Sequence, residues 1–278
     1  MFVVGTAYSG STLLGNALNG HSAISHIGEI SRLPCFGIGD PVDHCVLCAT
    51  AGVDCPVWTP ELIAEAGVVG PGRVHQVVRR HLGGVPVLVD GSKSIEWLER
   101  CLGPGDGVSS PFVLISVRHP FAFADSSRRR ASMSPADAGV LWRDVMSAVV
   151  SRSTDFGLAN LVVRYEDLAR DPAWVLGRVV DSLGLEPEPG LTEFWRHDAH
   201  VLGGNGGAYV WYESFRRSGG FVTEEDRVVA QSYAERRFGG WADDKWRTSL
   251  SPSDIRTVAS TPRLEGVAEF FGYDLSPA

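Results

Sequence analysis

A glycine-rich turn near the start of the chain has the composition of an anion-binding loop. The apolar residues 2–4 lead into Gly5-Thr6-Ala7-Tyr8-Ser9-Gly10-Ser11-Thr12, and a helical pattern begins at Thr12. A strand–turn–helix of this kind aims backbone N–H groups and the positive end of a helix dipole at one point, which favours phosphate. The spacing fits the nucleotide-binding pattern G-x-x-x-x-G-K-S/T, except that Ser11 stands where lysine is expected. We therefore expect a phosphorylated donor other than ATP or GTP.

A second pair of residues has the spacing of a phosphate clamp. Arg118 follows the apolar run 112–117, and Pro120 begins a helix that places Ser126 two turns further on. A guanidinium group binds phosphate through two parallel, charge-assisted hydrogen bonds, and a serine hydroxyl adds a third contact. The alternative for Arg118 is a structural ion pair.

The elements that must position these residues alternate along the chain. Apolar runs at 2–4, 85–89, 112–117 and 161–165 are separated by helical patterns. Continuous apolar runs are typical of strands covered on both faces. We therefore predict a three-layer α/β fold, with a central parallel sheet, helices on both faces and a P-loop-like nucleotide site.

Helix starts and strand ends extend this prediction. Thr59-Pro60 and Ser134-Pro135 have the composition of an N-cap followed by proline at the first helical position. Ligands of open parallel sheets lie at the carboxyl ends of the strands. The first loop, the turn at 90–94, Arg118 and the pair at 166–167 should therefore converge.

Together these segments resemble the sulfotransferases that use 3′-phosphoadenosine 5′-phosphosulfate (PAPS). In that family a loop of the form basic-Ser-Gly-Ser/Thr-Thr cradles the 5′-phosphosulfate, and residues 8–12 stand in its place. An arginine and a serine eight residues apart hold the 3′-phosphate, as Arg118 and Ser126 would. Residues 164–168 also look like a segment common in the family.

The resemblance implies one sulfotransferase domain over residues 1–278, whose later part is matched more loosely at His200, Gly204-Asn205 and 245–247. It implies that the reaction leaves adenosine 3′,5′-bisphosphate, that the acceptor is a hydroxyl of a small molecule or sugar, and that the chemistry needs no metal. The nucleotide-binding residues that it implies are Ser9, Gly10, Ser11, Thr12, Leu13, Arg118, Ser126 and Asn205.

The resemblance also indicates a general base. Glu29 lies 21 residues after Tyr8, about where the sulfotransferases that modify protein tyrosine have a glutamate base. The alternative is an exposed loop carboxylate. His21, His26 and His200 are rival bases.

Tyr8 departs from the family, which usually has lysine or arginine there. A phenol donates a hydrogen bond but carries no charge. Lys93 precedes Arg118 by 25 residues, close to where the tyrosine-modifying enzymes have a catalytic lysine. We therefore predict that Lys93 supplies the missing charge, with Tyr8 and His200 as further catalytic candidates. A solvated lysine is the alternative.

Four cysteines lie close together in the sequence, at Cys35, Cys45, Cys48 and Cys55. They fall in an apparently irregular insertion at about 34–58. The C-x-x-C unit has the spacing of a zinc site. Structural zinc on these four residues, a disulfide pair and unlinked thiols are all open.

Composition limits the remaining functions. The chain has 278 residues and a net charge of −8, which argues against nonspecific nucleic-acid binding. No apolar run is long enough for a membrane span, and Met1 leads straight into the first strand, so we expect a cytoplasmic protein. Two other functions fit the loop: an ATP-dependent small-molecule kinase with magnesium on Asp90, and a nucleotide-binding protein without turnover.

Overall fold

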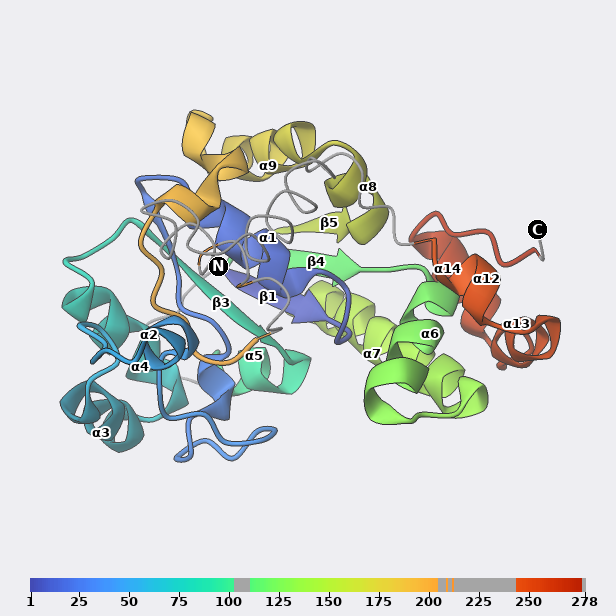
Figure 1. Ribbon diagram of the computed structural model, residues 1–278, viewed down its shortest axis with the longest axis horizontal. Coiled ribbons are helices and arrows are strands. Elements are labelled where there is room, and N and C mark those ends of the chain that lie inside the picture. The colour runs from blue at the N-terminus through green and yellow to red at the C-terminus, as the bar shows by residue number, and fades with distance from the viewer. Residues whose placement is uncertain (103–110, 205–208, 210–211, 213–243, 277–278) are drawn as a thin grey trace.

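A five-stranded parallel sheet forms the centre of the molecule (Figure 1). The computed structural model describes residues 1–102, 111–204, 209, 212 and 244–276. The strand order is β2-β3-β1-β4-β5. The strands are β1 (Phe2–Gly5), β2 (Ile24–His26), β3 (Val87–Lys93), β4 (Val113–Val117) and β5 (Asn160–Arg164). This order places β1 in the middle, with β3 and β4 as its two neighbours.

Helices cover both faces of the sheet, as predicted. The connection from β1 to β2 runs toward one edge, and the connections from β3 to β4 and from β4 to β5 run toward the other. Because such crossovers are right-handed, α1 (Ser11–Leu18) lies on one face, and α5 (Ile95–Cys101) and α7 (Pro135–Asp155) lie on the opposite face. The predicted three-layer α/β fold is confirmed.

The remaining elements lie around this core. Short 3₁₀ turns are η1 (Ile30–Arg32), η2 (Pro189–Thr192) and η3 (Phe194–Arg196). The other described helices are α2 (Val46–Ala51), α3 (Pro60–Val69), α4 (Pro71–His81), α6 (Pro120–Ala131), α8 (Tyr165–Arg170), α9 (Pro172–Asp181), α12 (Trp246–Ser249), α13 (Pro252–Ala259) and α14 (Leu264–Phe270). The last three pack beside α6 and α7, at the opposite end of the molecule from α3 and α4 (Figure 1).

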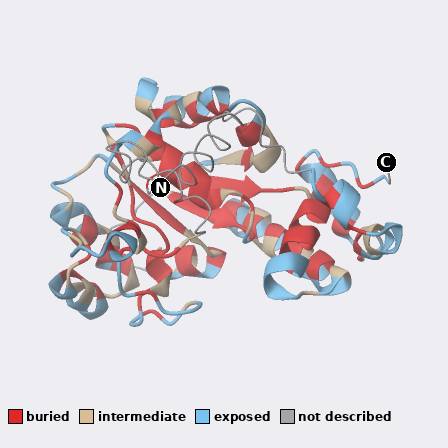
Figure 2. Cartoon of the chain, viewed as in Figure 1, coloured by how far each residue is buried: buried red, intermediate tan, exposed pale blue. Residues whose placement is uncertain are grey.

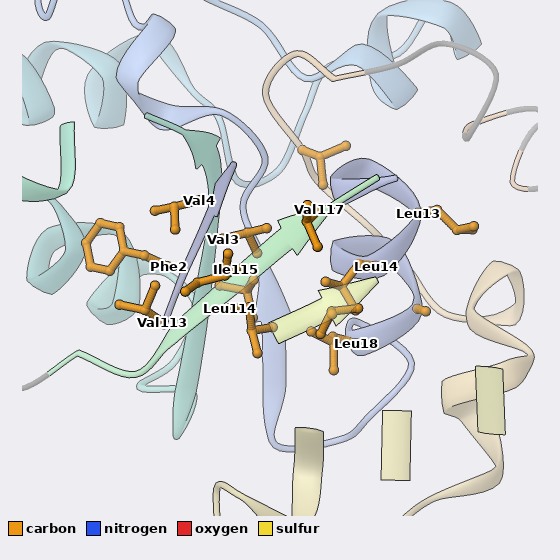
Figure 3. Close-up of a cluster of buried hydrophobic side chains, with 14 of the residues drawn as sticks. Phe2, Val3, Val4, Leu13, Leu14, Leu18, Val113, Leu114, Ile115 and Val117 are labelled. Carbon is orange, nitrogen blue, oxygen red and sulfur yellow. The ribbon is translucent and has the colours of Figure 1, made fainter. Parts of the chain in front are cut away.

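The core extends over both faces of the sheet, and one part of it lies where the sheet meets α1. Two of the three inner strands, β1 and β4, are buried along their whole length, which explains their unbroken apolar sequence (Figure 2). Leu14 and Leu18 of α1 pack toward these strands (Figure 3). Burying such side chains stabilises the fold by about 1.5–3 kcal/mol each, so the sheet that carries the strand ends is firmly held.

Both predicted helix starts are confirmed. The Thr59 hydroxyl accepts the N–H of Leu62 at 3.3 Å, and the Ser134 hydroxyl accepts that of Asp137 at 3.2 Å. The run predicted at 85–89 begins at Val87 and continues to Lys93. The three-residue strand β2 was not predicted, because it is too short to show a pattern. Among the described helices, none is both long and apolar enough to cross a membrane.

Candidate active site

Residues of the candidate site stand at or just beyond the carboxyl end of each strand. In sheet order they are Glu29 just beyond β2, Lys93 at the end of β3, the loop after β1, Arg118 after β4 and Tyr165 after β5. The chain leaves β1 toward β2 and β3 on one side and later adds β4 and β5 on the other, so the strand order reverses at β1. Such a point, where the strand order reverses, is where open α/β sheets bind ligands.

The loop after β1 has the backbone of an anion site. Tyr8 has φ 59° and Gly10 has φ 84°, so the chain turns sharply before α1. Gly10 is the N-cap residue of α1 and supplies no capping side chain. The Ser9 hydroxyl donates to the Thr6 carbonyl at 2.8 Å, which fixes the turn. Ser11, Thr12 and Leu13 form the first turn of the helix, which begins one residue earlier than the sequence predicted.

The loop is anchored to the neighbouring strand as well. At Gly5, whose φ is 142°, an added Cβ would lie 2.1 Å from the carbonyl oxygen of Ser116 on β4. The Ser116 hydroxyl donates to the carbonyl oxygen of Ser9 at 3.1 Å. Only glycine fits at position 5, so the strand can approach β4 closely and place the loop beside Arg118.

Arg118 joins the two predicted phosphate sites. Its side chain is buried, and Nη1 lies 3.1 Å from the Tyr8 carbonyl oxygen and 3.2 Å from Ser126 Oγ. The indole N–H of Trp142 donates to the Arg118 carbonyl at 2.9 Å. The structure therefore brings together Arg118, Ser126 and the loop, from three different elements.

Tyr165 completes this part of the site, and sequence reasoning did not assign it a role. Its ring lies under the Arg118 guanidinium, whose central carbon is 4.4 Å from the ring centroid. The same ring packs on Gly10, where an added Cβ would lie 2.6 Å from it. The available signal was its position at the end of an apolar run.

The three arginines at 128–130, which follow Ser126, make two kinds of contact. Arg128 and Arg129 donate to the buried carboxylate of Asp125, at 3.2 and 2.8 Å. Burial acts to raise the pKa of Asp125, and bonds from Arg129, Ser249 and Arg128 outweigh it, so its pKa lies below the usual value. Arg130 instead places its guanidinium 5.6 Å from the centre of the Tyr8 ring.

The predicted base and the predicted catalytic lysine are in contact. Lys93 Nζ donates to Glu29 Oε1, and Arg32 Nη1 donates to Glu29 Oε2 at 3.0 Å. Glu29 is 7 % exposed and the Lys93 side chain 19 %. Neither is therefore the solvated surface residue that the alternative interpretations required.

Solved structures with this arrangement of elements are known. The chain is similar to the sulfotransferase domain of the olefin synthase from Synechococcus PCC 7002, with a TM-score of 0.59, 21% identity and coverage of 98% of this chain and 94% of that one. It is also similar to the sulfotransferase domain of the curacin biosynthetic pathway, with a TM-score of 0.63, 18% identity and coverage of 98% and 97%. The fold is that of a sulfotransferase domain. No family model and no curated protein matches the sequence.

Two of the rival bases have structural roles. His21 Nε2 lies 2.9 Å from the Glu186 carbonyl oxygen, and its Nδ1 accepts the N–H of Ala23 at 3.0 Å. His26 is buried between α1 and β3, with Nδ1 3.2 Å from Asn16 Oδ1. Burial lowers the pKa of His26 to about 4, with Asp90 opposing and Lys93 adding to the shift.

Asp90, the carboxylate that a kinase would need for magnesium, is held by protein donors. His75 and the Trp97 indole contact Oδ2 at 2.8 and 2.7 Å, and the backbone N–H of Ser92 donates to Oδ1 at 2.9 Å, with the Ser92 hydroxyl beside it. Its oxygens are thus occupied by donors in the protein interior. The kinase hypothesis receives no support from this residue.

His200 lies among three of the cysteines. His200 Nδ1 lies 3.5 Å from the Sγ atoms of both Cys48 and Cys55, so His200 sits in the cysteine cluster. Cys45 belongs to the same cluster, whereas Cys35 is exposed and lies against α3. All five cysteines are free thiols. The structure therefore places His200, and not Cys35, with the other three cysteines. Asn205, the remaining nucleotide candidate, lies outside the described residues.

Proposed function

We propose that this chain transfers the sulfuryl group of PAPS to a hydroxyl group of a small-molecule or carbohydrate acceptor. The observation that carries the proposal is the contact of one buried guanidinium, that of Arg118, with both Ser126 and the carbonyl of Tyr8. A donor with phosphates at both ends of a nucleoside needs two anion sites at a fixed separation. Through this contact, Arg118 connects the candidate 3′-phosphate site with the loop that follows β1.

The donor side follows from the charges available. The 5′-phosphosulfate would lie at the N-terminus of α1, where the helix dipole and the backbone of the loop favour an anion. The 3′-phosphate would bind Arg118 and Ser126. Because Arg118 is stacked on Tyr165, its guanidinium is already oriented, and little rotamer freedom is lost on binding.

The chemistry exchanges one sulfur–oxygen bond for another. The acceptor oxygen forms a bond to sulfur while the bond from sulfur to the 5′-phosphate oxygen breaks, which leaves adenosine 3′,5′-bisphosphate. Glu29 would take the hydroxyl proton as the new bond forms. Lys93 would offset the negative charge that builds on the bridging oxygen. In the resting protein, their ion pair holds the two groups in contact.

Tyr8 has a lesser role in this proposal. Its ring faces Arg130, so the position that is usually basic is served by a phenol with a cation behind it. The full charge nearest the base is on Lys93, which donates directly to Glu29. We therefore propose that Lys93 interacts with the bridging oxygen and that Tyr8 contributes a hydrogen bond.

The acceptor would approach from the β2 side of the loop. Glu29 lies there, against the backbone of Leu202 and beside Arg32. The two similar sulfotransferase domains come from an olefin synthase and from a biosynthetic pathway. A hydroxyl on a biosynthetic intermediate is therefore the acceptor class that we favour, with sugars as the other class to test. The cytoplasmic location stays a prediction.

Binding and turnover test the proposal separately. By calorimetry, adenosine 3′,5′-bisphosphate should bind at least ten times more tightly than ADP or AMP, with no dependence on magnesium. Turnover is then measured as transfer of labelled sulfate from PAPS to a panel of hydroxy acids and sugars. Equal affinity for ADP together with a magnesium requirement would favour the kinase, and tight nucleotide binding without transfer to any acceptor would favour a binding protein.

A further inference from the structure

Three thiols and one imidazole from distant parts of the chain meet at one point. Cys45, Cys48 and Cys55 come from the insertion around α2, and His200 comes from the segment that precedes Leu202. The four ligand atoms all lie within 4.8 Å of one another. His200 Nδ1 is 3.5 Å from Cys48 Sγ and 3.5 Å from Cys55 Sγ.

These distances are those of a tetrahedral metal site. With metal–sulfur bonds of about 2.3 Å and metal–nitrogen bonds of about 2.0 Å, tetrahedral geometry places sulfur and nitrogen about 3.5 Å apart and two sulfurs about 3.8 Å apart. The His200–thiol distances of 3.5 Å match the first value. A disulfide would instead require two sulfurs at about 2.0 Å, and all four cysteines around the insertion are free thiols.

A tryptophan orients two of the four ligands. The backbone N–H of Trp58 donates to Cys55 Sγ at 3.2 Å, and its indole N–H donates to the His200 carbonyl at 2.7 Å. Such hydrogen bonds to ligand residues fix their orientation and are a regular part of metal sites. Trp58 is itself buried, so this support is rigid.

We propose that Cys45, Cys48, Cys55 and His200 bind one zinc ion in a structural site. Three thiolates and one imidazole form a soft, tetrahedral ligand set, which suits zinc. Four protein ligands leave no open position for a substrate, so the site is not expected to be catalytic. A hollow of about 410 Å³, lined in part by the three cysteines, gives the ion a route to them from solvent.

The ion would fasten the insertion to the segment behind Glu29. Cys45 and Leu202 form an antiparallel bridge, and the N–H of Val46 donates to the Val201 carbonyl at 3.0 Å. The Leu202 carbonyl in turn accepts the backbone N–H of Glu29 at 2.7 Å. Zinc on His200 would thus hold the segment that positions Glu29. This last link rests on the proposed function, whereas the metal site does not.

Metal analysis of the full chain tests the site. The protein is purified without a polyhistidine tag and dialysed against a weak chelator before elemental analysis. We expect about one zinc per chain, and less than about a fifth of that in the Cys48→Ser and His200→Ala variants. Cys35→Ser and Cys101→Ser are matched controls that remove a thiol outside the cluster, and both should keep the metal.

Cobalt substitution distinguishes this site from adventitious binding. Co(II) in a tetrahedral site with thiolate ligands gives strong visible d–d bands and sulfur-to-metal charge transfer, which octahedral surface ions lack. These bands should appear in the wild type and in Cys35→Ser, and disappear in Cys48→Ser. Protein without zinc whose mass is two hydrogens lower, or loss of metal in Cys35→Ser but not in His200→Ala, would overturn the proposal.

The link to Glu29 has its own measurement. Removal of the metal with a strong chelator should increase amide hydrogen exchange at 42–58 and 200–204, and should lower turnover while the affinity for adenosine 3′,5′-bisphosphate stays within about twofold. Unchanged exchange at 200–204 after complete metal loss would refute the link. Since metal content and cobalt spectra need no turnover, the site stands or falls independently of the sulfotransferase proposal.

Discussion

Lys93 donates a hydrogen bond to the carboxylate of Glu29, 64 residues earlier in the chain. The contact exists because the chain beyond β2 runs alongside β3: the Ile27 N–H donates to the Val89 carbonyl at 3.0 Å, and the Gly91 N–H to the Gly28 carbonyl at 2.7 Å. A carboxylate and an ammonium group at the ends of adjacent strands thus form one unit. Four predictions follow from this unit and its surroundings, in addition to the metal test.

The first prediction concerns Glu29 as general base. Glu29→Gln keeps the size of the side chain and removes its ability to take a proton, so kcat should fall by roughly 10²–10⁴. The affinity for adenosine 3′,5′-bisphosphate should change by less than about threefold, because the proposed 3′-phosphate contacts, Arg118 and Ser126, lie on the other side of β1 from Glu29. Glu65→Gln, which alters a surface ion pair with Arg80, is the control. Normal turnover in the Gln variant would exclude Glu29 as the base.

The second prediction separates Lys93 from Tyr8. A cation aimed at developing charge is worth a few kcal/mol, so Lys93→Ala should lower kcat by about two orders of magnitude or more. Tyr8→Phe removes only a hydroxyl and should cost less than about tenfold. Circular dichroism checks that both variants are folded. Loss of activity in Tyr8→Phe with a mild Lys93→Ala would reverse the two roles.

The third prediction concerns the donor. Arg118→Ala should weaken binding of adenosine 3′,5′-bisphosphate at least tenfold, since a hydrogen bond to a charged group contributes about 1.5–3 kcal/mol. Binding of AMP, which lacks the 3′-phosphate, should change little. Arg129→Ala removes an arginine that pairs with Asp125 and is the matched control. Equal losses for AMP and the bisphosphate would mean that Arg118 does not read the 3′-phosphate.

The fourth prediction concerns stability and pH. Burial lowers the pKa of His26 from 6.5 to about 4, so below pH 6.5 the unfolded chain binds a proton that the folded chain does not. Stability is therefore complete above the unfolded pKa and decreases as the pH falls toward 4. From this residue we expect a loss of about 2 kcal/mol between pH 8 and pH 5.

Urea unfolding at the two pH values measures this loss. The His26→Gln variant should lose about 2 kcal/mol less than the wild type over the same interval, whatever its stability at pH 8. An identical pH dependence in His26→Gln and the wild type would contradict the assignment.

Local patterns predicted the fold well. Apolar runs and N-cap residues locate β1, β4, β5, α3 and α7, because strand burial and helix capping depend on residues close in sequence. The carboxyl-end rule then brought the loop, Lys93 and Arg118 to one edge of the sheet. The strand β2 was not predicted, because a strand of three residues is too short to show an alternating pattern.

Contacts between distant segments were harder to predict. Cys35 is close to Cys45 in the sequence, yet the structure places His200, and not Cys35, in the cluster. The partner lies 145 residues beyond Cys55, and contacts such as the antiparallel bridge between Cys45 and Leu202 bring it there. Tyr165 is similar: its contact with Arg118 depends on the pairing of β4 with β5, which no local pattern records.

The central position of β1 divides the site into two independently variable halves. Glu29 and Lys93 belong to β2 and β3 on one side, and Arg118 and Tyr165 belong to β4 and β5 on the other. Under the proposed function, residues that meet the acceptor can change without disturbing those that bind the donor. Exchange of residues 33–44 between proteins of this fold, which keeps Glu29, Arg32 and Cys45, would therefore be a practical way to alter acceptor choice while keeping the same sulfate donor.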